Sequence, residues 1–342
     1  MRRKRILITG GAQGIGRQLV QRFHDDGAIV FTIDKDKATI EQLKKDLPNV
    51  TAVQMDLADW DGTRKTIESF GALDHVVNNA GVVIPQAFMD VTKEMANLHF
   101  DVNVLACFNV IQTAAKGMIE QGTGGTIVNI SSICSSPNLN SAAVELAAHN
   151  IRTNCIAPGL VDTPMARIED PVLQTNIQKL ISRCPIKRTI DTNEIVDLVM
   201  FVLSPLASMI TGETTVIDGG VGKRLVQRFN EGGAIILALD KNAETIELLT
   251  KEHFEVNTLA SINIVQSAAR GMIRRLIDSP MAKLNNPTVQ QMVERFMQET
   301  VIKRPIDPNE IADLVLFLLS PLSAMITGEN ILIDGGRMCG VN

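Results

Sequence analysis

The chain has 342 residues, of which 45% are hydrophobic and 21% are charged. This mix is usual for a protein with a packed core and excludes a disordered chain. At roughly 100–200 residues per domain, the length allows one large domain or two small ones. The net charge is −5 with acids and bases interspersed, so no basic stripe can neutralise a phosphate backbone and we expect no nucleic-acid partner.

Targeting and metal-binding patterns are not found in the sequence. The five cysteines form no C-x-x-C pair and the five histidines no H-E-x-x-H pattern, so we predict reduced thiols and no metal. The basic N-terminus is followed by only three apolar residues before a Thr-Gly-Gly turn, which favours a strand over a signal peptide. No stretch reaches the roughly 18 uncharged residues of a membrane span, so we expect a cytoplasmic protein without a membrane partner.

Strands and helices are expected to alternate along the first part of the chain. A strand at residues 5–9 leads into a glycine loop and a helix, in which Ile15, Leu19 and Phe23 recur at helical spacing. Further strands are predicted at 28–34, 50–56, 73–78 and 126–130, with a helix around 96–119. This alternation predicts an α/β fold of the Rossmann type, a doubly wound parallel sheet with helices on both faces. Such sheets bind ligands at the carboxyl ends of their strands, at the topological switch point.

Parts of the sequence occur twice. Residues 15–23 recur at 221–229, residues 99–103 at 253–257 and residues 187–220 at 303–336, so the offset falls from 206 to 154 to 116 positions. The lack of a fixed period indicates a duplication with sharp gaps and not a solenoid. We therefore divide the chain into a dinucleotide-binding unit at 1–220 and a truncated second copy at 221–342 that lacks several strands. We expect the second copy to pack on the first or to be partly disordered.

The glycine loop has the spacing of a phosphate-binding turn. Gly10 permits a tight turn, Gly14 lets the backbone approach a pyrophosphate, and Gly16 allows the helix to pack closely. Asp34 follows at the end of the second strand, 20 residues past Gly14, where its carboxylate can accept both ribose hydroxyls. The same carboxylate would repel the 2′-phosphate of NADP, so NAD(H) is favoured, although Lys35 beside it leaves NADP(H) open.

Several motifs together resemble those of the short-chain dehydrogenase/reductase family. They are Thr-Gly-Gly-Ala-Gln-Gly-Ile-Gly at 9–16, Asn-Asn-Ala-Gly at 78–81, Asn103, Ile-Ser-Ser at 130–132 and Pro-Gly at 158–159. The runs at 56–60, 91–94 and 128–132 are most similar to members that reduce dicarbonyls and ketoses such as xylulose. The resemblance spans nearly all of residues 1–220, and it implies an NAD(P)-dependent oxidoreductase that acts on a small carbonyl and forms a homo-oligomer.

The resemblance also implies roles for individual residues. Asp56 and Leu57 would border the adenine, and Ser132 would hydrogen-bond the substrate carbonyl. The remaining cofactor contacts would come from the glycine loop, the turn after the fourth strand and the nicotinamide end of the cleft: Gly10, Gln13, Gly14, Ile15, Gly16, Asn79, Ala80, Gly81, Pro158, Gly159 and Thr163. A structural interpretation stays open for each, since residues 79–81 could form an ordinary strand-end turn and Ser132 a solvated cap.

The family's catalytic Tyr-x-x-x-Lys pair is missing. In the family the lysine lowers the pKa of the phenol, so that the tyrosine can protonate the oxyanion as hydride arrives. This chain contains no tyrosine, and the sequence at 136–150 retains only the tail of the expected helix. Asn103, which would support the missing lysine, is then expected to be a buried polar residue satisfied by the backbone.

A substitute proton donor is conceivable. Glu145 and His149 lie four residues apart and would share a helical face, and a histidine can donate a proton near neutral pH. We favour the simpler interpretation that both solvate or cap the end of the helix.

Three hypotheses follow. The chain is an oxidoreductase by descent, with the segment that carries Tyr and Lys absent from this sequence. Alternatively, it is a pseudoenzyme that binds a dinucleotide through Gly10, Gly14, Gly16 and Asp34. In the third, the first copy docks the helices of the second copy or of another subunit, and the role is structural.

Overall fold

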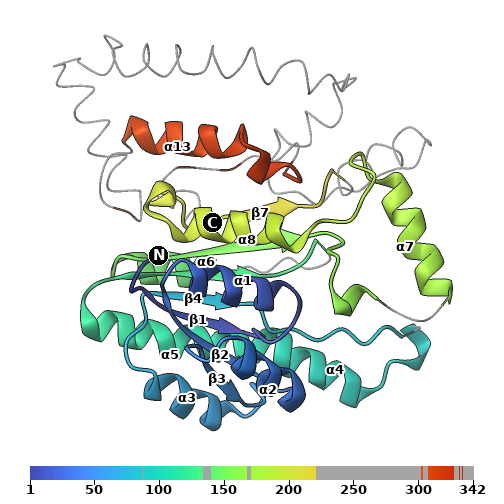
Figure 1. The fold of residues 1–342 in the computed structure, drawn as a ribbon, viewed down its shortest axis with the longest axis horizontal. Coiled ribbons are helices and arrows are strands. Elements are labelled where there is room, and N and C mark those ends of the chain that lie inside the picture. The colour runs from blue at the N-terminus through green and yellow to red at the C-terminus, as the bar shows by residue number, and fades with distance from the viewer. Residues whose placement is uncertain are drawn as a thin grey trace.

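The computed structural model describes residues 1–86, 88–133, 140–167, 171–220, 302, 307–326, 331 and 333. Figure 1 shows the elements in chain order: β1 (Arg5–Thr9), α1 (Gly14–Asp25), β2 (Ile29–Asp34), α2 (Lys37–Asp46), β3 (Thr51–Gln54), α3 (Trp60–Ser69), β4 (His75–Asn78), η1 (Phe88–Asp90), α4 (Lys93–Phe100), the π-turn η2 (Asp101–Leu105), α5 (Ala106–Gln121), β5 (Gly125–Ile130), α6 (Asn140–Ala147), β6 (Ile151–Pro158), η3 (Pro164–Ala166), α7 (Pro171–Arg183), α8 (Thr192–Leu203), η4 (Pro205–Ala207), β7 (Thr214–Ile217), α13 (Pro308–Leu318) and η6 (Pro321–Ser323).

The seven strands form one parallel sheet in the order β3-β2-β1-β4-β5-β6-β7. The chain moves outward from β1 to β3 and then returns to the other side of β1 with β4. The switch point therefore lies between β1 and β4, at the carboxyl end of the strand that leads into the glycine loop. The predicted doubly wound parallel sheet is confirmed.

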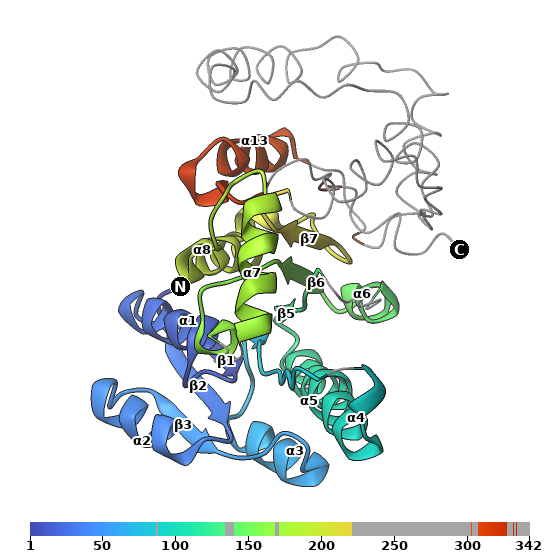
Figure 2. The same ribbon diagram turned by 90° about the vertical axis from the view of Figure 1, so that its right-hand side faces the viewer.

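Helices cover both faces of the sheet, as Figure 2 shows with α1 and α8 on one side and α5 and α6 on the other. Leu19 of α1 and Val199 of α8 belong to one buried apolar cluster, and Val110 of α5 and Leu146 of α6 to the other. Each such side chain stabilises the fold by roughly 1.5–3 kcal/mol through its burial. Strands covered on both faces explain why residues 5–9 and 75–78 are almost continuously buried.

Several element boundaries differ from the sequence prediction by one to three residues, and two of the differences have a clear physical reason. The strand predicted at 50–56 is only Thr51–Gln54, because β3 is an edge strand that pairs with β2 alone. The helix predicted at 96–119 begins at Lys93, where the Thr92 side chain accepts a hydrogen bond from the Met95 N–H and caps the first turn.

This helix continues through the π-turn to Gln121. Lys93–Gln121 is the one helix of the described residues with the length and apolar composition needed to cross a membrane, and half of its apolar 18-residue window is buried within the fold. Its α5 part packs Val110, Ala114 and Met118 into the core beneath the sheet, which accounts for the apolar composition.

Most of the second copy lies outside the described residues, but α13 packs on the first copy. Leu314 and Phe317 of α13 are buried in the same apolar cluster as α8. The rings of Phe201 and Phe317 stack with centroids 4.2 Å apart and planes 6° apart. This part of the second copy therefore packs on the first copy, which is one of the two alternatives predicted for it.

Candidate functional site

The turns after β1 and β4 are fastened together by one asparagine. The Asn79 amide nitrogen donates to the carbonyls of Thr9 and Gly10, at 3.0 and 3.1 Å. The Thr9 hydroxyl oxygen accepts from the backbone N–H groups of Asn79 and Ala80, at 3.0 and 3.1 Å. Because both strands end here, this clasp fixes the shape of the sheet edge at the switch point. Asn79 and Ala80 therefore support the glycine loop whether or not they also touch a ligand.

The glycines of the loop are required by geometry. Gly10 has φ +65°, and a β-carbon there would lie 2.8 Å from the Ala80 Cα. At Gly16 a β-carbon would lie 2.1 Å from the Gly10 carbonyl oxygen and 2.6 Å from the Asn79 amide nitrogen. Atoms this close cannot coexist without a backbone shift. The loop can follow this path only with glycine at both positions.

Gly14 begins α1 and faces Thr163 from the other half of the sheet. It has φ +53°, and a β-carbon there would come within 3.4 Å of the Thr163 methyl group. Gln13, the N-cap residue, has an exposed side chain that makes no capping hydrogen bond. The positive end of the α1 dipole thus lies at a glycine without a side-chain cap, which fits the pyrophosphate of a dinucleotide.

Asp34 is held against this loop. One carboxylate oxygen accepts from the Ala12 N–H at 3.1 Å and the other from the Asp36 N–H at 3.2 Å. A carboxylate has about four acceptor positions, so roughly two remain for further donors such as ribose hydroxyls. The half-buried position at the end of β2 agrees with the spacing argument from the sequence.

The residues expected around the adenine lie after β3. Asp56 is exposed, and its carboxylate accepts from the Ala58 N–H at 3.0 Å. Leu57 is buried and its side chain belongs to the core cluster beneath the sheet. The Leu57 side chain therefore serves packing, which leaves its backbone as the part that can border a ligand. Ile15 similarly packs its half-buried side chain against the core on the other face.

Pro158, Gly159 and Thr163 line the far side of the switch point. Pro158 ends β6 opposite Ile217 of β7, and the Gly159 N–H donates to the Ile217 carbonyl at 2.9 Å. Thr163 is the N-cap residue of η3 and is half-buried, with its methyl group toward Gly14. The structure thus brings the glycine loop and the segment after β6 together.

Ser132 and Asn103 lie beside this edge. Backbone pairing with β6 continues past β5 through Ser131 and Ile133, so the half-buried Ser132 sits at the carboxyl end of the sheet. Asn103 lies in the π-turn, and its amide exchanges two hydrogen bonds with the backbone of Val82, at 2.8 and 3.0 Å. The expected backbone partner of Asn103 is confirmed, but the expected burial is wrong because the residue is exposed.

No group in the described region replaces the missing acid and its lysine. The helix α6 ends at Ala147, and Asn150 turns the chain with φ 58°, so Glu145 and the exposed His149 do not share a helical face as predicted. Lys116 pairs with Glu120 at 4.0 Å on the exposed side of α5, and Lys187 is exposed. The site therefore holds the features of a dinucleotide cradle without a recognisable proton donor among the described residues.

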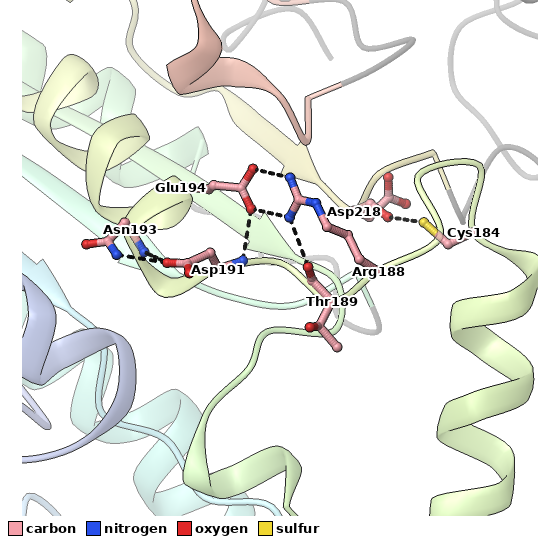
Figure 3. Close-up of polar contacts among 7 residues, drawn as sticks. All are labelled: Cys184, Arg188, Thr189, Asp191, Asn193, Glu194 and Asp218. Carbon is pink, nitrogen blue, oxygen red and sulfur yellow. Dashed lines mark hydrogen bonds and ion pairs between the residues drawn. The ribbon is translucent and has the colours of Figure 1, made fainter.

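A small pocket lies next to Gly159 under α7. Figure 3 shows the polar contacts of its lining: Arg188 binds Glu194 through both ends of its guanidinium, at 2.7 and 2.8 Å, and the Cys184 thiol points to the Asp218 carbonyl. Burial raises the pKa of the Cys184 thiol, so it stays protonated. The lining is mostly apolar: Leu160, Leu180, Ile181, Cys184, Arg188, Ile190 and Asp218.

Sequence reasoning missed a buried polar cluster below the switch point. The Asn78 amide donates to the Asn129 side chain at 2.9 Å, and the Cys107 thiol lies 3.3 Å from the same oxygen. Burial raises the pKa of Cys107 to about 12 and that of Cys155 to about 11, so neither is a reactive thiolate. The only sequence signal was two asparagines inside apolar strands. Within the described ranges, no group of three or more His, Cys, Asp or Glu side chains could hold a metal ion.

The parallel sheet, its switch point and the glycine loop define a Rossmann-type α/β protein. Two family models match the sequence: short chain dehydrogenase over residues 4–140, and Enoyl-(Acyl carrier protein) reductase over residues 138–222 and again over 265–337. The second model thus matches both copies of the repeated segment.

Curated relatives match this chain over almost their whole length. L-xylulose reductase of Bos taurus is 36% identical over an alignment of 236 residues that covers 64% of this chain and 96% of the relative. D-erythrulose reductase of Gallus gallus is 35% identical over 64% of this chain and 96% of its own. Carbonyl reductase (NADPH) 2 of Sus scrofa is 34% identical over 63% of this chain and 95% of its own.

Solved structures give the same result. A short-chain type dehydrogenase/reductase from Mycobacterium ulcerans superposes with a TM-score of 0.59 at 25% identity, covering 65% of this chain and 90% of that one. A 3-oxoacyl-(acyl-carrier protein) reductase from Brucella melitensis superposes with a TM-score of 0.57 at 27% identity, over 64% of this chain and 91% of its own. The chain belongs to the short-chain dehydrogenase family, and it resembles the L-xylulose and carbonyl reductases within it.

Proposed function

We propose that residues 1–220 bind a nicotinamide dinucleotide, with NAD(H) preferred, and that the reduction of a small carbonyl by this chain is strongly impaired. The observation that carries the proposal is the cradle formed by Gly14, the uncapped start of α1 and Asp34. Three different kinds of interaction meet there: an open backbone, a helix dipole and a fixed carboxylate.

Each part of the cradle has a distinct task. The first N–H groups of α1 would bind the pyrophosphate, and the Asp34 carboxylate would accept the ribose hydroxyls. The relatives reduce L-xylulose, D-erythrulose and other carbonyls by their names, which makes a small dicarbonyl or ketose the substrate class. The bound cofactor would supply the hydride, and Ser132 would hydrogen-bond the carbonyl oxygen.

The proton is the missing part of the reaction. A positioned general acid contributes about 10²–10⁴-fold to the rate of such a step. The chain has no tyrosine and the described residues offer no other recognisable donor at the site, so water would supply the proton. We therefore infer that this protein retains dinucleotide binding but has lost efficient catalysis.

Asp34 supports the preference for NAD(H), because a carboxylate facing the 2′-position repels a phosphate there. The name of the Sus scrofa relative refers to NADPH, so the preference of this chain is a point on which it would differ from that relative.

Binding is tested by following NADH fluorescence while the full chain is added. We expect saturable binding of NADH, and weaker binding of NADPH. The Asp34→Ala variant should bind NADH about 10–100-fold less tightly, because a charge-assisted hydrogen bond contributes about 1.5–3 kcal/mol. Asp36→Ala is the matched control. It removes the same charge two residues from Asp34, and the Asp36 side chain only caps α2. Equal affinities for the two variants would count against the assignment of Asp34.

A further inference from the structure

The contact between α13 and α8 joins two copies of one sequence segment. Residues 187–220 recur at 303–336, so each residue of α13 and η6 has an equivalent 116 positions earlier, in α8 and η4. Both helices start with the same capping box, Asp191 with Glu194 and Asp307 with Glu310. The two elements are therefore alike in sequence and in local structure.

Equivalent residues meet at the centre of this contact. Phe201 and Phe317 are 116 positions apart and are the pair whose rings stack with centroids 4.2 Å apart. Only 6% of Phe201 and 8% of Phe317 is exposed, so the stack is closed to solvent. A residue that packs against its own equivalent lies on or near a two-fold axis.

The surrounding contacts are reciprocal. The helix α8 contacts η6, and the helix α13 contacts η4, although η4 and η6 are themselves equivalent segments. Such an exchange, in which i meets j and j meets i, is the pattern of an isologous interface between two identical subunits. Here it occurs within one chain. Figures 1 and 2 both show α13 lying beside α8, past the β7 edge of the sheet.

The polar contacts at the rim show that the pairing is specific and not fully symmetric. The Ser208 hydroxyl donates to the Glu310 carboxylate, and the Gly219 N–H donates to the Met325 carbonyl at 3.0 Å. The equivalent of Ser208 is Ala324, which has no hydroxyl to donate to Glu194. Glu194 binds Arg188 instead. The two copies therefore differ in sequence at Ser208 and Ala324, where the polar contacts on the two sides also differ.

We propose that the second copy closes the α8 face from within the chain. The helix α13 takes the position that α8 of another molecule would take in a two-fold dimer of the single-copy unit. The apolar face of α8 is then covered by a helix of the same chain, and this protein does not self-associate through α8. The subunit contacts of the expected homo-oligomer would therefore use other surfaces.

Cysteine cross-linking in the full chain tests this arrangement. We would compare Phe201→Cys alone, the double variant Phe201→Cys/Phe317→Cys, and the control Phe201→Cys/Leu316→Cys, each treated with a short thiol-specific cross-linker. Leu316 is next to Phe317 in sequence but is 48% exposed on α13. The parent chain gives the background from the five native cysteines. Non-reducing electrophoresis and peptide mapping identify the products.

We expect the first double variant to link within one chain, with a yield independent of protein concentration, because an intrachain pair has an effective concentration near the millimolar range. The control should link at least about tenfold less, and Phe201→Cys alone should give no covalent dimer. The pair Ser208→Cys/Glu310→Cys repeats the test at the rim and leaves the phenylalanine stack intact.

Three results would overturn the proposal. Covalent dimers from Phe201→Cys alone would mean that α8 pairs with α8 of a second molecule. Covalent dimers from either double variant would mean that α13 is exchanged between chains. Failure of both double variants to link would mean that α13 does not dock on α8.

Discussion

Replacing Gly16 with alanine should disrupt the glycine loop at one identified contact. The new β-carbon would lie 2.1 Å from the Gly10 carbonyl oxygen and 2.6 Å from the Asn79 amide nitrogen. Both partners belong to the clasp between β1 and β4, since Asn79 donates to the carbonyls of Thr9 and Gly10. The loop must move away from α1, and the clasp must loosen.

The size of the effect follows from two terms. Overpacking of a close-packed site costs about 1–3 kcal/mol, and two weakened hydrogen bonds cost about 0.5–1.5 kcal/mol each. The free energy of unfolding should therefore fall by about 2–6 kcal/mol. NADH affinity should fall as well, because a displaced loop would move Gly14 and the start of α1, which form the cradle together with Asp34.

Urea unfolding and NADH titration of the same preparation measure both effects. Gly117→Ala is the matched control, because a β-carbon there would have its nearest neighbour at an ordinary 3.9 Å. It removes a glycine from the interior of α5 and should stabilise the chain by up to about 1 kcal/mol. If Gly16→Ala unfolded at the wild-type urea concentration and bound NADH as tightly, the assigned role of the loop would be wrong.

Three further predictions concern other parts of the fold. Burial lowers the pKa of His75 to about 4, so the unfolded chain takes up a proton at this residue before the folded chain does. The free energy of unfolding should therefore fall by up to about 3 kcal/mol as the pH falls from about 6.5 towards 4. Urea unfolding of His75→Phe should show a flatter pH profile than the wild type. The Arg152 guanidinium donates to the carbonyls of Val202, Ile210 and Ser204, so Arg152→Met should lower the free energy of unfolding by about 2–4 kcal/mol, and an unchanged urea midpoint would contradict this. Asn103→Ala should free the segment at Val82, seen as faster amide exchange there, with the exchange of β1 amides as the control.

The sequence was sufficient to predict a doubly wound parallel sheet and to locate its first five strands, but not the ranges of β6 and β7. Strand β1 and the start of α1 follow from a short apolar run, a glycine turn and helical spacing, which are all local signals. The start of α4 was missed because its signal is the Thr92 cap and not apolar spacing. The end of β3 could not be predicted, because it depends on having a neighbour on one side only.

The sequence could predict which residues lie near the candidate site better than it could predict the contacts between them. The spacing of the glycines and Asp34 located the cradle, but the Asn79 clasp joins residues about 70 positions apart and has no local signal. Asn103 was expected to be a buried residue satisfied by the backbone, because the lysine that it would support is missing; the π-turn gives it the backbone partner at the surface. The helical face expected to be shared by Glu145 and His149 was wrong, because α6 ends at Ala147, two residues before the histidine.

The central claim is that this chain binds a nicotinamide dinucleotide but reduces carbonyls poorly. One experiment tests it most directly: NADH binding and NADH oxidation with a small dicarbonyl, measured on the same preparation of the full chain. The account predicts saturable binding with turnover about 10²–10⁴-fold below that of a relative that has its tyrosine. Absence of saturable binding, or turnover equal to that of the relative, would contradict it.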